Sequence, residues 1–151
     1  MPEKKYDIII LSGGFDPPHI GHVRMIQDAR SRAKRVFVGI NSDDWLNRKK
    51  GYVFMSWLER AEMVEAIKGV DEVRRFNDKD NTANALLKKI RKENPYSRIA
   101  FGNGGDRTNI NTPEKETCEK QIIDMVWAVG GGYKAQSSSV LVDKIKETEK
   151  K

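Results

Sequence analysis

The sequence contains a single cysteine, Cys118, and only two histidines, and it has no apolar run as long as a membrane span. One cysteine cannot form an internal disulfide or a cysteine-rich metal site, and its thiol suits a reducing cytoplasm. Residues 1–5 show no signal-peptide pattern and lead directly into an apolar run. We therefore expect a cytoplasmic protein without a membrane segment, whose 151 residues form one domain, 1–151.

The chain has fewer acidic than basic residues: its 22 aspartates and glutamates and 28 lysines and arginines give a net charge of +6. This balance favours anionic partners, either nucleic acid or small phosphorylated substrates. A basic nucleic-acid-binding or RNA-modifying protein is one hypothesis. The aromatic residues are not interleaved with basic ones, however, as nucleic-acid binding would favour. We therefore expect small phosphorylated substrates rather than nucleic acid as partners.

Apolar runs typical of buried strands alternate with helical patterns along the whole chain. Strands are predicted at 6–11, 35–40, 73–76, 98–101 and 122–128, the last also compatible with a helix by periodicity alone. Helices are predicted at 18–33, from Ser56, around 86–90, after an N-cap at Thr112, and after 137–139. This alternation predicts a doubly wound α/β domain with a mostly parallel five-stranded sheet.

Both histidines lie in the turn between the first predicted strand and the first predicted helix. The glycine pair Gly13–Gly14 lets the backbone approach a phosphate closely, and Pro17–Pro18 suits a helix start. His19 and His22 are three residues apart, so a helical turn places both on one face, with Gly21 between them. A helix N-terminus adds free N–H groups and a positive dipole end. The turn is therefore predicted to bind a polyphosphate.

Three further segments have both a structural and a functional interpretation. The basic stretch Arg48–Gly51 is predicted as a loop, either solvated surface or a cover for phosphates. Arg60 lies in the first turn of the predicted helix that opens at Ser56, where it is either simply exposed or holds an anion. Gly104–Asp106 is either an ordinary glycine-rich turn or a site where Asp106 accepts a hydrogen bond from a ribose hydroxyl.

The three consecutive serines Ser137–Ser139 precede a predicted helix. In isolation they favour simple capping of that helix. Together with free N–H groups, three hydroxyls could instead hold a phosphate.

Residues 12–22 resemble the G-x-F-D-x-x-H-x-G-H signature of the nucleotidylyltransferase (cytidylyltransferase-like) superfamily, with Gly14 where many members have threonine. Glu59–Arg60, Gly104–Asp106 and Ser137–Ser139 resemble three other blocks of the same superfamily. Gln136 stands where members commonly have isoleucine before the serines. The Arg-Thr pair usual in its cytidylyltransferases is absent upstream of them.

The resemblance implies a Rossmann-like nucleotidylyltransferase that transfers a nucleotidyl group from an NTP, either ATP or CTP, to a small phosphomonoester and releases pyrophosphate. It implies His19, His22 and Lys50 as catalytic residues. The implied nucleotide-binding residues are Ser12, Gly13, Gly14, Phe15, Gly21, Gly104, Gly105, Asp106, Ser137, Ser138 and Ser139. The implied residues for the acceptor substrate are Asp16, Lys49, Arg60 and Arg107.

Mg²⁺ is expected as the cofactor, held mainly by phosphates and water rather than by a metal site of the protein. A homodimer is also expected. The Gly104–Asp106 block favours a sugar-phosphate adenylyltransferase of the heptose-1-phosphate type. The alternative is a glycerol-3-phosphate-type cytidylyltransferase, against which the missing Arg-Thr pair counts. A catalytically inactive nucleotide-binding module is a third hypothesis, and the intact histidines argue against it.

Overall fold

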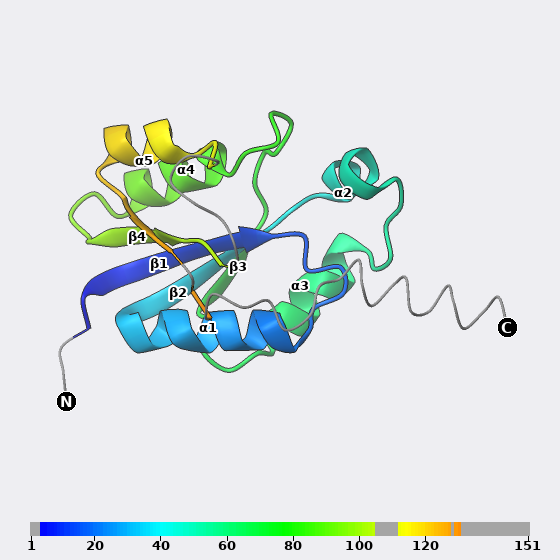
Figure 1. Ribbon diagram of the computed structural model, residues 1–151, viewed down its shortest axis with the longest axis horizontal. Helices are drawn as coiled ribbons and strands as arrows, with labels where there is room; N and C mark the ends of the chain where they lie inside the picture. Colours follow the sequence, from blue (N-terminus) through cyan, green and yellow to red (C-terminus); the bar gives the residue numbers. More distant parts are fainter. Residues whose placement is uncertain (1–3, 105–111, 128, 131–151) are drawn as a thin grey trace, which may run out of the picture.

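In the computed structural model, which describes residues 4–104, 112–127 and 129–130, five parallel strands form one sheet (Figure 1). The strands lie in the order β3-β2-β1-β4-β5, and each neighbouring pair is parallel. They are β1 (Tyr6–Gly13), β2 (Ala33–Ile40), β3 (Glu72–Arg74), β4 (Ile99–Gly102) and β5 (Asp124–Val126). The predicted fold class is confirmed, and the segment with ambiguous periodicity is strand β5.

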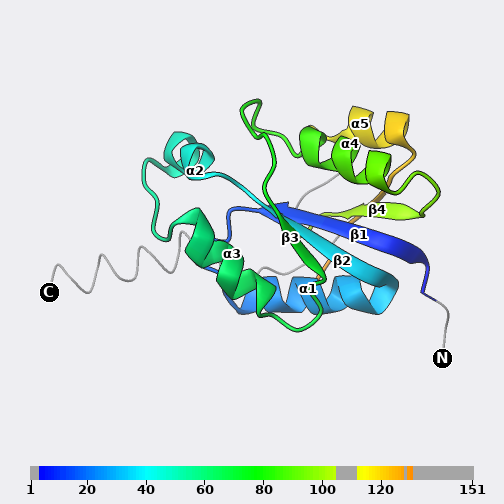
Figure 2. The same ribbon diagram turned by 180° about the vertical axis from the view of Figure 1, so that it is seen from behind.

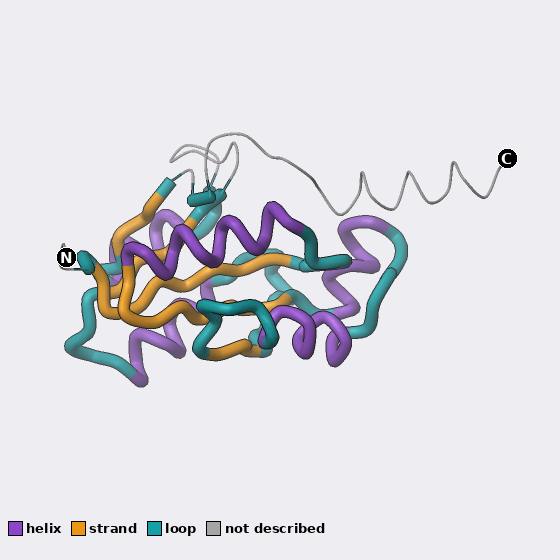
Figure 3. Tube along the Cα trace, turned by 90° about the horizontal axis from the view of Figure 1, so that it is seen from below, coloured by secondary structure: helices purple, strands orange, loops and turns teal. Residues whose placement is uncertain are grey.

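Helices cover both faces of the sheet, as a doubly wound fold requires. Helices α1 (Ile20–Arg32) and α3 (Trp57–Glu65) lie on one face, and α4 (Asn84–Glu93) and α5 (Lys115–Gln121) lie on the other (Figures 1 and 2). The view from below in Figure 3 shows α1 running along the strands. Helix α2 (Asp43–Lys50) lies beyond the end of the sheet at which β1 and β2 terminate. None of the helices described is both long and apolar enough to cross a membrane.

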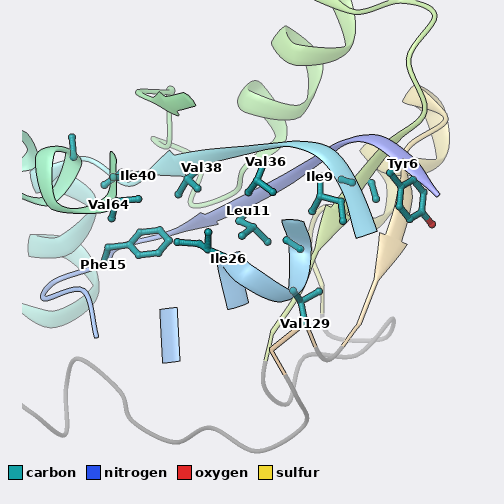
Figure 4. Close-up of a cluster of buried hydrophobic side chains, with 14 residues drawn as sticks. Tyr6, Ile9, Leu11, Phe15, Ile26, Val36, Val38, Ile40, Val64 and Val129 are labelled. Carbon is teal, nitrogen blue, oxygen red and sulfur yellow. The ribbon is translucent and has the colours of Figure 1, made fainter. Parts of the chain in front are cut away.

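The central strand β1 supplies both halves of the hydrophobic core, because successive side chains of a strand point to opposite faces. Ile9 and Leu11 pack in the cluster under α1 and α3, and Figure 4 shows them with Phe15 and Ile26. Ile8 and Ile10 pack in the cluster under α4 and α5. This two-sided burial explains the uninterrupted apolar run at the start of the chain.

Two local predictions were wrong. The basic stretch 48–50 is the last turn of helix α2, which Ser42 caps by accepting a hydrogen bond from the Trp45 N–H. The helix ends at Gly51, whose φ of 84° is favourable for glycine. Helix α5 begins at Lys115, with Glu114 rather than Thr112 as its N-cap. Thr112 belongs instead to the preceding turn, where its carbonyl accepts from the Lys115 N–H at 3.3 Å.

The strand order places a topological switch point between β1 and β4, where successive connections run to opposite sides of the sheet. Ligands of open α/β sheets bind at the carboxyl ends of the strands at such a point. The segments after β4 and β5 both pack against α1. An added Cβ at Gly104 would lie 3.1 Å from Met25 Sδ, and Gly130 donates its N–H to Asp28 at 2.7 Å.

Candidate active site

The two histidines form a reciprocal cap at the start of α1. The His19 Nδ1 atom accepts the Gly21 N–H at 3.1 Å, and the His22 Nδ1 atom accepts the His19 N–H at 3.1 Å. The two rings stack with centroids 3.9 Å apart, and the Phe15 ring lies 4.5 Å from that of His22. The predicted sharing of one helix face is therefore realised, and the rings are held by the backbone that they cap.

These hydrogen bonds also determine where the ring protons lie. A neutral imidazole has one N–H and one acceptor nitrogen, and the hydrogen bond at one nitrogen sets the state of the other. Because Nδ1 accepts in both rings, Nε2 carries the N–H in both. The turn thus presents two ring N–H donors at a helix N-terminus, a combination suited to phosphate oxygens.

Asp16 fixes the segment before α3 against the turn that carries the two histidines, residues 12–22, here called the histidine turn. Its side chain is buried, and its two carboxylate oxygens accept the N–H groups of Phe54 at 2.8 Å and Met55 at 2.6 Å. The sequence resemblance implies Asp16 as an acceptor-binding residue. The structure instead occupies both of its oxygens with backbone donors, so its observed contacts position a neighbouring segment.

Lys50 is brought to the histidine turn although it lies 34 positions after Asp16. Its Nζ atom donates to the Asp16 carbonyl at 3.2 Å and lies 3.6 Å from the Asp16 Oδ2 atom. The ammonium also lies 5.1 Å from the Tyr52 ring centroid. The adjacent Lys49 is exposed and lies over the Trp45 ring at 5.7 Å. Of these two lysines, Lys50 is the one that contacts the turn.

Arg60 is completely buried and binds protein oxygen atoms. Its guanidinium donates to the Met55 carbonyl at 2.9 Å, to the Gly14 carbonyl at 2.7 Å, to the Asn41 carbonyl at 2.8 Å and to the Asp43 carboxylate at 2.6 Å. These partners come from the end of β1, from the end of β2 with the start of α2, and from the segment before α3. The expected anion contact is thus replaced by contacts that hold three segments of the site together.

A second buried group, Asp78, joins this network and was not predicted from the sequence. It accepts from the Asn41 side chain at 3.1 Å, and from the Ser42 N–H and hydroxyl at 2.8 Å each. It therefore fixes the start of α2 to the segment after β3. Asp78 lies in a polar run after a predicted strand, and a run of polar residues carries no signal of burial.

The glycines of the turn have packing reasons for their identity. An added Cβ at Gly14 would lie 3.0 Å from Leu46 Cδ2 and 3.4 Å from Trp45 Cζ3. A larger residue at position 14 would therefore require the side chains of α2 to shift. Ser12 and Gly13 form the carboxyl end of β1, paired with β2, and Phe15 is buried in the core.

Gly104 lies two residues after the end of β4 and beside Met25 of α1. The other predicted site residues of that block, Gly105, Asp106 and Arg107, lie outside the described residues, as do Ser137, Ser138 and Ser139.

Within residues 4–104, 112–127 and 129–130 there is no group of three or more histidine, cysteine, aspartate or glutamate side chains arranged to hold a metal ion. Asp16, which lies in the same turn as His19, already accepts two backbone hydrogen bonds.

The chain is a doubly wound parallel α/β protein, a class that binds ligands at the carboxyl ends of the strands beside the switch point, where the histidines follow β1. The chain belongs to the cytidylyltransferase-like family, whose profile matches residues 10–147. It is a nucleotidyltransferase, in agreement with the sequence resemblance.

Curated relatives match either the whole chain or part of a longer protein. An FAD synthase from Thermococcus sibiricus is 28% identical over 151 residues and covers 98% of both chains. The bifunctional protein HldE from Geotalea uraniireducens is 29% identical over 143 residues, which are 92% of this chain but only 27% of HldE. The chain therefore spans about a quarter of the length of that relative.

A solved structure supports the fold. The bifunctional NMN adenylyltransferase/ADP ribose pyrophosphatase from Francisella tularensis superposes with a TM-score of 0.69 at 19% sequence identity. The match covers 95% of this chain and 43% of that protein.

Proposed function

We propose that this protein transfers a nucleotidyl group from an NTP to a small phosphomonoester and releases pyrophosphate. In this reaction an oxygen of the acceptor phosphate forms a bond to the α-phosphorus. The bond from that phosphorus to the bridging oxygen breaks, and its electron pair leaves with pyrophosphate. The acceptor phosphate supplies its own nucleophile, so the protein needs only to position the two substrates and stabilise the charge of the transition state.

The stacked pair of histidines carries the proposal. With Nδ1 of each ring accepting a backbone hydrogen bond, the Nε2 N–H groups of His19 and His22 are donors for oxygens of the α- and β-phosphates. These donors are preorganised, because the rings are already fixed to the helix terminus that they cap. Such donors stabilise developing negative charge without reorganising during the reaction.

Lys50 supplies the positive charge in this scheme, and two buried residues hold the site in shape. The Lys50 ammonium lies against the histidine turn and would neutralise charge on the triphosphate or the acceptor. Asp16 and Arg60 would act as positioning residues, since their polar atoms bind backbone carbonyl and N–H groups of the surrounding segments. Lys49, on the exposed side of α2, would contribute only long-range attraction.

The nucleotide itself would lie along the carboxyl ends of β1 and β4. Ser12 to Phe15, Gly21 and Gly104 border this edge of the sheet. Gly105, Asp106, Arg107 and Ser137 to Ser139 complete the proposed site on the strength of the motif resemblance. Mg²⁺ remains part of the proposal, carried by the phosphates of the NTP. A cytoplasmic location and a homodimer are proposed as well, and light scattering in solution would test the dimer.

ATP is proposed as the nucleotide, and two acceptor classes have support. The Gly104–Asp106 motif favours a sugar phosphate, as in heptose-1-phosphate adenylyltransferases. The FAD synthase from Thermococcus sibiricus, which matches the chain from end to end, favours a flavin phosphate, because adding an adenylyl group to a flavin phosphate yields FAD. Cytidylyl transfer to glycerol 3-phosphate has less support, since the Arg-Thr pair of such enzymes is missing.

The test is a panel of four NTPs combined with a set of phosphomonoesters, with pyrophosphate release as the measurement. We expect release that requires ATP, Mg²⁺ and one acceptor class, and that stops when the metal is chelated. A chain that releases no pyrophosphate with any combination, while folded by circular dichroism, would contradict the proposed reaction.

A further inference from the structure

Four of the twelve aromatic residues of the chain lie within the short stretch 45–57, which runs from α2 into α3 beside the histidine turn. Three of them carry a cation over one ring face. Lys49 lies over Trp45, Lys50 lies over Tyr52 at 5.1 Å, and the Arg75 guanidinium carbon lies 3.8 Å from the Trp57 ring centroid. The fourth is Phe54, for which the described residues show no such contact.

Phe54 is unusual because its backbone is fixed by a hydrogen bond while the residue is only half buried. The Phe54 N–H donates to the Asp16 carboxylate at 2.8 Å, yet 46% of the residue surface remains accessible to solvent. The exposed half of Phe54 gains nothing from burial in the fold, so its position calls for another explanation. A ring held in place before a ligand arrives loses little conformational freedom on binding.

Phe54 is also close to the proposed reaction centre. Asp16, to which it is hydrogen-bonded, is three residues from His19, a separation that a chain can span over at most about 11 Å. Lys50 contacts the same Asp16. In the first turn of α1, Ile20 adds a second apolar side chain that is 48% exposed. The positive and hydrogen-bonding groups of the site thus adjoin exposed apolar surface.

We infer that Phe54 is a stacking platform for the acceptor, and that the acceptor is a phosphomonoester with a flat aromatic ring system. This inference rests on the proposed function. The acceptor phosphate would lie at Lys50 and the histidine turn, and the ring would lie on the Phe54 face. A sugar phosphate would need hydrogen-bonding side chains along this segment, but residues 52–55 are Tyr, Val, Phe and Met and contain a single hydroxyl group.

The experiment compares riboflavin 5′-phosphate with a hexose 1-phosphate as acceptors, at saturating ATP and Mg²⁺, for the intact chain and its variants. Binding of riboflavin 5′-phosphate is followed separately through quenching of its fluorescence. The variants are Phe54→Ala, the conservative Phe54→Tyr and the control Tyr96→Ala. Tyr96 is a 98% exposed aromatic residue in the connection from α4 to β4, which lies at the amino ends of the strands, opposite the carboxyl ends that carry the site.

We expect the intact chain to prefer the flavin phosphate, and Phe54→Ala to raise the KM for it by about tenfold, as the loss of one stacking partner should. Phe54→Tyr should restore the wild-type value, Tyr96→Ala should leave it unchanged, and the KM for ATP should not move. All variants should melt within a few degrees of the wild type, because Phe54 is half exposed.

Two outcomes distinguish a failure of the stacking platform from a failure of the proposed reaction. Turnover of the hexose phosphate alone, or flavin turnover that Phe54→Ala leaves unchanged, would overturn the platform and leave the proposed function standing. A chain that releases no pyrophosphate from any NTP, but quenches flavin fluorescence in a Phe54-dependent way, would overturn the proposed reaction and support the platform.

Discussion

His19 and His22 each have two tasks, because the ring that is proposed to bind phosphate also caps helix α1. Replacement by alanine therefore removes a ligand contact and a cap together. Asparagine is among the best N-cap residues, and glutamine is a natural third residue of a capping box. The variants His19→Asn and His22→Gln thus preserve the cap while removing the ring N–H donor.

We predict that His19→Ala, His22→Ala, His19→Asn and His22→Gln each lower turnover by on the order of 10²–10³-fold, as loss of a transition-state donor does. His19→Ala should also lose about 1 kcal/mol of the free energy of unfolding, and His19→Asn should lose only a small part of that. Steady-state pyrophosphate release and urea denaturation measure the two effects. Near-wild-type turnover of His19→Asn would remove that ring from the mechanism.

Arg60 gives a second prediction at the same scale. Alanine at this position would leave the Gly14, Asn41 and Met55 carbonyls without their buried donor and the Asp43 carboxylate without its ion pair. We expect Arg60→Ala to destabilise the fold by about 3–5 kcal/mol, as breaking a buried charge network does.

Denaturant titration checks this value, with Arg24→Ala as the matched control, because Arg24 is an exposed arginine of α1. The control should change the free energy of unfolding by less than about 0.5 kcal/mol. A stable Arg60→Ala variant with reduced substrate affinity would show that Arg60 acts on an anionic substrate after all.

At the scale of elements, strand β2 and helix α4 are in close contact at a glycine, Gly39. A Cβ built at Gly39 would lie only 2.3 Å from Leu86 Cδ2 and 3.0 Å from the Phe76 ring. We predict that Gly39→Ala destabilises the protein by about 1–3 kcal/mol, the usual cost of overpacking a core.

The double variant Gly39→Ala/Leu86→Ala tests whether this contact is the cause. Shortening Leu86 creates a cavity that the new methyl group can enter, so the double variant should be less destabilised than the two single variants added together. Thermal melts of the four proteins complete the cycle. Simple additivity would mean that the cost of Gly39→Ala arises elsewhere.

For the molecule as a whole, the titration of Cys118 makes the free energy of unfolding depend on pH. Burial, reinforced by the nearby Glu114 and Glu119, raises the pKa of this thiol from 9.0 to about 12. The folded state therefore holds the thiol proton more tightly than the unfolded state does. Stability from this group is complete below pH 9 and falls as the pH rises from 9 towards 12.

We predict that the free energy of unfolding decreases more steeply between pH 9 and pH 11 in the wild type than in Cys118→Ala, which lacks the titrating group. Guanidinium denaturation at several pH values measures the difference. In addition, alkylation of Cys118 at pH 8 should be slow in the native protein and fast in denaturant, because the buried thiol stays protonated. Equal pH profiles for the two proteins would contradict the raised pKa.

The sequence by itself determined the fold class and the central feature of the site. Local patterns indicate both. They are the apolar run at 8–11, the glycine and proline residues between the first strand and the first helix, and the two histidines three residues apart. The same reasoning wrongly predicted a loop at residues 48–50. These residues are the basic last turn of α2, and the acidic first turn of that helix and Gly51 after it are also helix signals.

Only the tertiary structure decided which charged residues are enclosed and which face the site. Arg60, Asp16 and Asp78 are polar in the sequence and give no sign of burial, yet each is surrounded by backbone groups from segments distant along the chain. Lys49 and Lys50 are neighbours in sequence, and the turn of α2 directs only Lys50 to Asp16. The hydrogen-bond partners of these side chains depend on which strand ends lie side by side in the sheet. A local sequence pattern carries no information about that arrangement.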